Sequence, residues 1–142
     1  MNDSKIKIIR PSNVVGTSAP SNLFMTSIIK EAVETGQIIL HSTLDSEKDY
    51  VYIDDLVQLI PKIIFSDKFQ IYNIASGYNI SSNEIINEII HITNCELKID
   101  PDAKKFSSEK INIDKIKNEF NFVPTRITDK IEELVKFYQN LN

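Results

Sequence analysis

Apolar positions along the chain follow two different periods, which predicts strands interleaved with helices. Short β-branched or aromatic runs are typical of strands, and they occupy residues 5–9, 37–40, 50–53, 69–75 and 96–99. The first strand is expected to stop at Arg10-Pro11, because proline has no backbone N–H with which to continue a central strand. Residues 11–21, rich in Ser, Asn, Thr and Pro, are then expected to form a loop.

Apolar residues at three- and four-residue steps predict helices between these strands. The first helix is expected to end at Gly36, and the second to be kinked or shortened at Pro61. Ser81 and Glu84 have the spacing of a capping box, which predicts the start of a third helix. Two further helices are expected near residues 113–119 and 128–139.

Length and composition indicate one α/β domain over residues 1–142. Sixteen basic and twenty acidic residues give a net charge of −4, which argues against nucleic acid as a partner. No apolar run approaches the roughly 18 residues of a membrane helix, and the N-terminus lacks the apolar region of a signal peptide. A single cysteine, Cys95, cannot form an internal disulfide, so a cytoplasmic protein without a membrane partner is expected.

The sequence offers no catalytic or metal-binding constellation. No Cys or His lies at ligand spacing from His41 or His91, so structural or solvated roles are favoured for both. Asp54 and Asp55 are adjacent and would not face one site together, so a helix N-cap is favoured over acid–base chemistry. Cys95 has no basic neighbour that would activate its thiol. The three glycines, at positions 16, 36 and 77, cannot form a Gly-x-Gly-x-x-Gly loop.

Polar residues do stand at the ends of predicted strands. Asn13 follows the first strand, and Lys48 precedes the strand at residues 50–53. In open α/β folds, ligands lie at the carboxyl ends of the strands, where an amide donor and an ammonium group could hold an anion. The alternative roles, a turn residue for Asn13 and a solvated charge for Lys48, remain open.

Four blocks of the sequence stand out together, and they are IIRPSNVVG (8–16), KDYVYIDDL (48–56), IYNIASG (71–77) and IDKIKNEFNFVP (113–124). In order and spacing they resemble four segments of the extended short-chain dehydrogenase/reductases, the NAD-dependent nucleotide-sugar epimerases and dehydratases. Those proteins carry an Arg-Pro-x-Asn-Val-Tyr-Gly segment, an Arg-Asp-aromatic-Val-x-Val-Asp-Asp-Leu block, a Tyr-Asn-Ile-Gly/Ala-Ser-Gly strand and a closing Asp-x-x-Lys…Leu-Gly-Phe-x-Pro segment.

The resemblance covers the C-terminal, substrate-binding part of that family. It implies a portion of a Rossmann-like fold, with a few mainly parallel strands and four or five helices, and with the N-terminal dinucleotide-binding half absent. The parent family uses NAD or NADP, and neither is expected to bind this chain alone. None of the five tyrosines has a lysine four residues later, so the family's Tyr-x-x-x-Lys pair is missing and the chain alone is expected to be inactive.

The resemblance also implies roles for particular residues. Asn13 would hydrogen-bond the diphosphate of a nucleoside-diphosphate sugar, and Pro11, Ser12 and Asn13 would pass near the nicotinamide of the cofactor. The strand with Gln37 and Ile39 would lie against the nucleotide base. Lys48 occupies the place of a diphosphate-binding arginine, whose charge it keeps and whose bidentate fork it loses. Lys104 and Lys105 are the nearest candidates for a second arginine of the family.

Three hypotheses about function follow. In the first, which we favour, the chain is the substrate-binding half of such an enzyme. In the second, it is a non-catalytic module that pairs with itself or with a separate Rossmann half. In the third, it is an α/β domain unrelated to sugars. The strands at residues 5–9 and 69–75 would continue a sheet built by the missing half, and an unpaired strand edge invites association. A homo-oligomer or a separate Rossmann half is therefore the expected protein partner.

Overall fold

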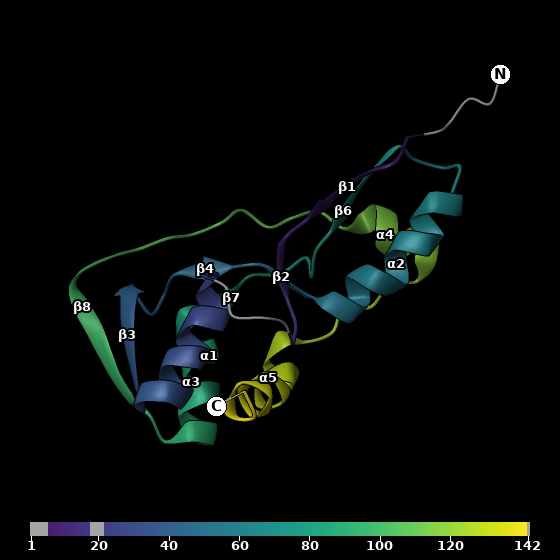
Figure 1. The fold of residues 1–142 in the computed structure, drawn as a ribbon. Coiled ribbons are helices and arrows are strands. Elements are labelled where there is room, and N and C mark those ends of the chain that lie inside the picture. The colour runs from purple at the N-terminus through teal and green to yellow at the C-terminus, as the bar shows by residue number, and fades with distance from the viewer. Residues whose placement is uncertain (1–5, 18–21, 142) are drawn as a thin grey trace.

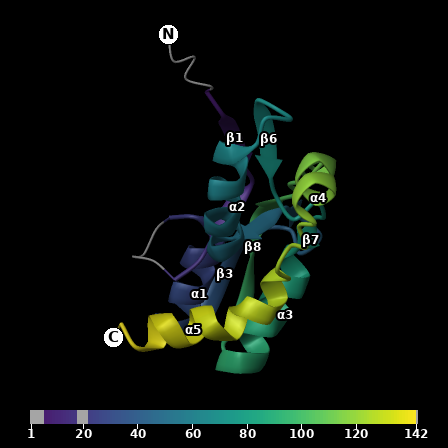
Figure 2. The same ribbon diagram turned by 90° about the vertical axis from the view of Figure 1, so that its right-hand side faces the viewer.

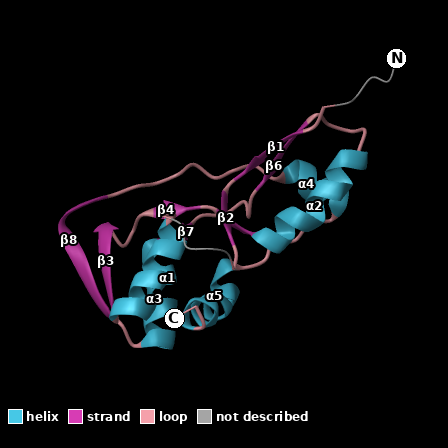
Figure 3. Cartoon of the chain, in the orientation of Figure 1, coloured by secondary structure: helices cyan, strands magenta, loops and turns pink. Residues whose placement is uncertain are grey.

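The computed structural model describes residues 6–17 and 22–141 and contains five α-helices, one 3₁₀-helix and eight short strands in these residues (Figures 1 and 3). In chain order the elements are β1 (Ile8–Pro11), β2 (Asn13–Val15), α1 (Phe24–Thr35), β3 (Gln37–Ser42), β4 (Glu47–Lys48), β5 (Tyr50–Tyr52), α2 (Ile53–Phe65), β6 (Ile71–Ile74), β7 (Ile80–Ser81), α3 (Ser82–Thr93), β8 (Glu96–Lys104), α4 (Asp114–Phe120), η1 (Ile127–Lys130) and α5 (Ile131–Gln139).

The strands pair mostly in parallel, which confirms the predicted fold class. β1 pairs with β6, β2 with β5 and β3 with β8, all in parallel, and the short β4–β7 pair is antiparallel. Figure 1 shows β1, β6, α2 and α4 toward one end of the molecule and β3, β8, α1, α3 and α5 toward the other. The pairs β2–β5 and β4–β7 lie between these two ends.

The first predicted boundary is wrong, because the strand continues through Pro11 and the expected loop contains β2. Ile8 N and Ser12 N donate to carbonyl oxygens of residues 70 and 74, both at 2.9 Å, so the even-numbered amides of this segment face β6. Pro11 lies at an odd position, on the side away from β6. Its missing N–H therefore removes no hydrogen bond of the β1–β6 pair.

Two helix ends follow the local sequence signals that predicted them. Gly36 ends α1 with φ of 70°, a left-handed conformation that glycine adopts without strain. Ser81 Oγ accepts from Glu84 N at 3.2 Å while Glu84 Oε2 accepts from Ser81 N at 3.0 Å, which confirms the capping box of α3. Pro61 lies on the exposed side of α2 and does not end it.

Two hydrophobic clusters form the interior. One gathers buried residues of α1, α3, α5 and β3, and includes Ile29, Ile38, Ile86 and Val135, each fully buried. The other lies among β5, β6, α2 and α4. Figure 2 shows α5 running beside α3, which closes the first cluster. The sequence therefore builds two packed bodies joined by short strand pairs, and the site described below lies on the first.

Candidate functional site

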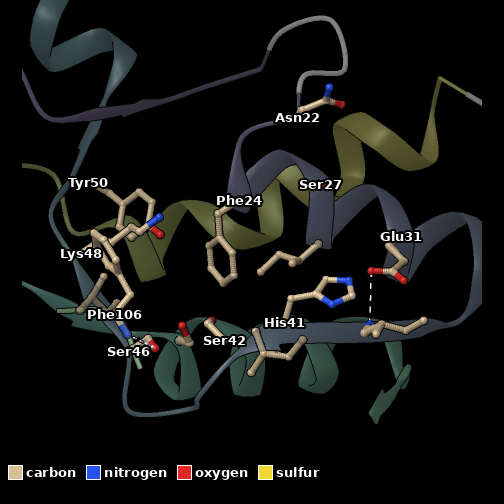
Figure 4. A pocket seen from close by; sticks show the side chains of 15 residues that line it. Asn22, Phe24, Ser27, Glu31, His41, Ser42, Ser46, Lys48, Tyr50 and Phe106 are labelled. Carbon is tan, nitrogen blue, oxygen red and sulfur yellow. Dashed lines mark hydrogen bonds between the residues drawn. The ribbon is translucent and has the colours of Figure 1, made fainter. Parts of the chain in front are cut away.

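A cavity of about 330 Å³ lies between helix α1 and strand β3 (Figure 4). From α1 it is lined by Phe24, Ser27, Ile28 and Glu31, whose i, i+3, i+4, i+7 spacing places them on one face of the helix. The opposite wall and the ends are formed by the other lining residues, which are Asn22, Ile39, Leu40, His41, Ser42, Ser46, Lys48, Tyr50, Ile80, Ser82 and Phe106.

One end of the cavity carries Lys48. Its Nζ lies 4.7 Å from the centroid of the Phe106 ring and 5.9 Å from that of Phe24, within the range of cation–π attraction. The antiparallel β4–β7 pair fixes the backbone of Lys48 opposite Ile80. The ammonium group is thus held between two aromatic rings at the cavity wall.

A smaller cavity of about 200 Å³ adjoins this end and shares four lining residues with the larger one, namely Asn22, Phe24, Lys48 and Tyr50. Asn13 lines the smaller cavity, and its Nδ2 donates to the carbonyl oxygen of Asp49 at 2.7 Å. The parallel β2–β5 register places Asn13 opposite Tyr50. Asn13 and Lys48, 35 positions apart in the sequence, are therefore brought to one small cavity.

The other end of the larger cavity carries acidic and imidazole groups. Glu31 Oε2 accepts from the backbone amide of Ile39 at 3.3 Å, and His41 Nδ1 lies 2.8 Å from Asp100 Oδ2. The hydrogen bond with His41 is the main cause that lowers the pKa of Asp100 below its ordinary value. The long cavity thus has the Lys48 ammonium group at one end and, at the other, the Glu31 carboxylate and the His41 imidazole, which Asp100 contacts from outside the lining.

The structure places the remaining predicted site residues away from the lining of these two cavities. Within residues 6–17 and 22–141, the lining of both includes neither Pro11, Ser12 and Gln37 nor Lys104 and Lys105. Lys105 Nζ instead pairs with Asp45 Oδ2 at 2.7 Å, which raises the pKa of the lysine and lowers that of the aspartate. Of the six residues expected to bind substrate, Asn13, Ile39 and Lys48 line a cavity.

Sequence reasoning missed several lining residues. Phe24 and Ile28 were part of the apolar pattern that predicted the first helix, and the i+3 and i+7 positions of Ser27 and Glu31 relative to Phe24 could have revealed a half-polar face. Phe106 comes from a segment after β8 that carries no local signal. Its amide donates to Ser46 Oγ at 3.0 Å, a contact across 60 positions that only the fold reveals.

Two buried aspartates support the site as structural anchors. Asp49 follows Lys48 and is 2% exposed, and its carboxylate accepts from Ser76 N at 2.9 Å, Ser76 Oγ at 2.9 Å and Gly77 N at 2.8 Å. These bonds tie the start of β5 to the loop after β6. The backbone next to Lys48 is therefore held in place by the hydrogen bonds of Asp49.

Asp55 corrects the expectation of a helix N-cap. Helix α2 begins at Ile53 with Tyr52 as its N-cap, and no side chain caps it. The buried Asp55 carboxylate accepts from Thr125 N at 2.9 Å and Thr125 Oγ1 at 2.8 Å instead. The aspartate thus joins α2 to the segment before η1, because a partner 70 positions away offers its carboxylate two donors.

A third hollow, of about 560 Å³, lies on the other body of the molecule. It is lined by residues of the loop at 76–78 and by a later segment that includes Lys110 and Lys117. The amines of these lysines make this hollow a second candidate site for an anion.

In the part of the chain that the structure describes, no group of three His, Cys, Asp or Glu residues could hold a metal ion. No helix among these same residues is both long and apolar enough to cross a membrane.

Comparisons with known proteins give a family from the sequence and a fold from solved structures. A sequence model described as the NAD dependent epimerase/dehydratase family matches residues 1–75. No curated protein sequence matches the chain. The structure is similar to that of TunA, an NAD dependent NDP-hexosamine 5,6-dehydratase involved in tunicamycin biosynthesis, with a TM-score of 0.81 and 15% identity over 96% of this chain and 46% of that one.

Two further solved structures have the same fold. The dTDP-glucose 4,6-dehydratase of Bacillus anthracis, in complex with NAD, gives a TM-score of 0.73 at 20% identity over 93% of this chain and 44% of that one. MoeE5, in complex with UDP-glucuronic acid and NAD, gives 0.76 at 12% identity over 94% of this chain and 47% of that one. The chain therefore spans about half the length of the solved structures that it matches.

Proposed function

The chain belongs to the NAD dependent epimerase/dehydratase family, and on that premise we propose that it is the part of such an enzyme that binds a nucleoside-diphosphate sugar. The proposal depends on one observation, which is that Asn13 and Lys48 both line the small cavity beside the α1–β3 cavity. MoeE5, which has the same fold, was solved in complex with UDP-glucuronic acid, and that complex supports this class of ligand.

The small cavity provides groups that suit a diphosphate. Lys48 supplies a positive charge whose Nζ already lies beside the rings of Phe106 and Phe24, so that few conformations of the side chain are lost on binding. The amide of Asn13 has two N–H donors, one directed at the Asp49 carbonyl and the other able to reach a phosphate oxygen. A charge-assisted hydrogen bond from Lys48 would carry most of the affinity.

The larger cavity suits the nucleoside. Phe24, Ile28 and Ile39 provide apolar walls for a flat base, and the hydroxyls of Ser27 and Ser42 provide partners for ribose. Because both cavities share Lys48, a diphosphate at the lysine leaves the nucleoside facing α1 and β3. The predicted contact of Ile39 with the base rests on this orientation.

Hydride transfer and cofactor binding are proposed to reside in a separate dinucleotide-binding half. The sequence has no Gly-rich dinucleotide loop and no Tyr-x-x-x-Lys pair, and it covers about half of each matched structure. NAD or NADP would lie against that other half. This chain would then fix the sugar nucleotide in place for a reaction at the boundary between the two halves.

An open surface on the other body is proposed to dock that half. Among the described residues, β1 pairs with β6 alone, and a two-stranded parallel pair gains stability from a further strand. On α2, Val57, Ile64 and Phe65 recur at i, i+7 and i+8 and are 58%, 58% and 86% exposed. A parallel strand with apolar flanks, as a dinucleotide-binding half provides, would cover both features.

Replacing Lys48 with alanine is expected to weaken binding of UDP or GDP to the chain by about ten- to a hundredfold, because a hydrogen bond to a charged partner contributes about 1.5–3 kcal/mol. Isothermal titration calorimetry of the 142-residue chain measures the dissociation constants. Lys62→Ala, an exposed lysine on α2, is the matched control and should leave them unchanged. Equal affinities for the Lys48→Ala variant and the wild-type chain would contradict the proposed diphosphate site.

A further inference from the structure

Glu31 places a carboxylate at the end of the cavity that the proposed function gives to the base. We infer that Glu31 makes this cavity selective for guanine, so that the ligand is a guanosine-diphosphate sugar. This inference rests on the proposed function, because it assigns a specific base to the same cavity. It concerns the far end of the site, away from Asn13 and Lys48.

The position of the Glu31 carboxylate is set by its helix and by β3. Glu31 lies two turns after Phe24 on the cavity face of α1, and Oε2 accepts from Ile39 N at 3.3 Å. Since β3 pairs with β8 along its other edge, this amide points from the open edge of β3 toward α1. The bond orients the carboxylate, and an ionised carboxylate keeps further lone pairs for a ligand.

Ligand orientation follows from the charges at the two ends of the cavity. Figure 4 shows Lys48 and Glu31 at opposite ends of the row of lining side chains, with Phe24 between them. Seven residues of helix separate Phe24 from Glu31, a rise of about 10 Å. A diphosphate is attracted to Lys48 and repelled by Glu31, so the base of a bound nucleotide lies toward Glu31.

An ionised carboxylate accepts hydrogen bonds and donates none, so it selects a base by its pattern of donors. Guanine presents N1–H and the N2 amino group side by side, which gives two parallel donors for two carboxylate oxygens. Uracil and thymine present one N–H between two carbonyl oxygens, and these oxygens would face the carboxylate unfavourably. Adenine and cytosine each present one amino group beside a ring nitrogen that is itself an acceptor.

A nearby pair borders the same end of the cavity. His41 lines the cavity between Phe24 and Glu31 in Figure 4, and its Nδ1 lies 2.8 Å from Asp100 Oδ2. This contact orients the imidazole, whose side chain is 75% exposed. The selection of the base therefore depends on the Glu31 carboxylate and not on His41.

The test compares GDP and UDP binding to the 142-residue chain by calorimetry, for the wild type and for Glu31→Gln. We expect GDP to bind about tenfold tighter than UDP, and Glu31→Gln to weaken GDP by about tenfold while leaving UDP unchanged. Glutamine keeps an oxygen for the Ile39 amide and places an NH₂ group where a guanine donor would point. Glu34→Gln, which alters the exposed ion pair with Lys30, is the control and should change neither constant.

The possible outcomes separate the two proposals. If neither nucleotide binds the wild-type chain, the proposed function itself is overturned, and the base assignment with it. If both bind with equal affinity, or UDP binds tighter, the sugar-nucleotide site stands and the assignment of guanine is overturned. A preference for GDP that persists in Glu31→Gln would likewise overturn the role of Glu31 alone. A thermal melt by circular dichroism shows whether each variant is folded.

Discussion

Replacing Asp49 with alanine is expected to lower the free energy of unfolding by about 3 kcal/mol, because it leaves two backbone amides, those of Ser76 and Gly77, without their acceptor. These amides lie 2.9 Å and 2.8 Å from the carboxylate, and the Ser76 hydroxyl, which also contacts the Tyr78 carbonyl at 2.9 Å, loses one of its two acceptors. Urea unfolding followed by circular dichroism measures the change. The same variant should weaken nucleotide binding, since Lys48 precedes Asp49 in the chain.

Asp45→Ala is the matched control for this prediction. Asp45 is an exposed aspartate four positions earlier, paired with Lys105, and its removal should leave the unfolding free energy unchanged within error. An equal loss of stability in both variants would show that the Asp49 network has no special role. An Asp49→Ala chain that is as stable as the wild type would contradict the account of this aspartate as an anchor.

Introducing glutamate at both Val57 and Phe65 is expected to abolish self-association of the chain. Without a dinucleotide-binding half, the exposed stripe on α2 and the open edge of β1 should bring two copies together, because both apolar surface and unpaired strand edges favour contact. Glutamates facing one another in that contact would weaken it by at least about a hundredfold. Sedimentation equilibrium over a range of protein concentrations measures the association.

Ile99→Glu is the control for the double variant, because Ile99 is a 47% exposed apolar residue on β8, at the far end of the molecule in Figure 1. It should leave association unchanged. Wild-type chain that stays monomeric at every concentration would contradict the proposed docking surface. Association that persists in the Val57→Glu, Phe65→Glu variant would show that copies meet through another face.

Local signals in the sequence predicted the elements whose causes are local. The capping box at Ser81 and Glu84 and the left-handed Gly36 depend on residues within one turn, and both are confirmed. The strand boundary predicted at Pro11 was wrong because the effect of a proline depends on which edge of the strand its nitrogen faces. That edge is set by the pairing partner β6, which begins 60 positions later. The sequence pattern predicts a strand there but does not reveal which of its edges forms hydrogen bonds with a neighbouring strand.

The same limit applies to the site. The resemblance to the epimerase/dehydratase family is confirmed by the family match, and the blocks that carry it include Asn13 and Lys48. Asp55 could not be interpreted from its neighbours because its partner, Thr125, follows 70 positions later. Phe106 reaches the cavity from a segment with no pattern of its own. Contacts across such separations arise only once the whole chain is folded.

The measurement that tests the central claim most directly is a ¹H–¹⁵N NMR titration of the chain with a nucleoside diphosphate. We predict saturable shifts of the Asn13 side-chain amide, of the Lys48 backbone amide and of the amides of residues 39–42 in β3, which line the two adjoining cavities. Shifts that instead centre on Lys110 and Lys117, in the third hollow, would contradict the account, as would a spectrum that does not change.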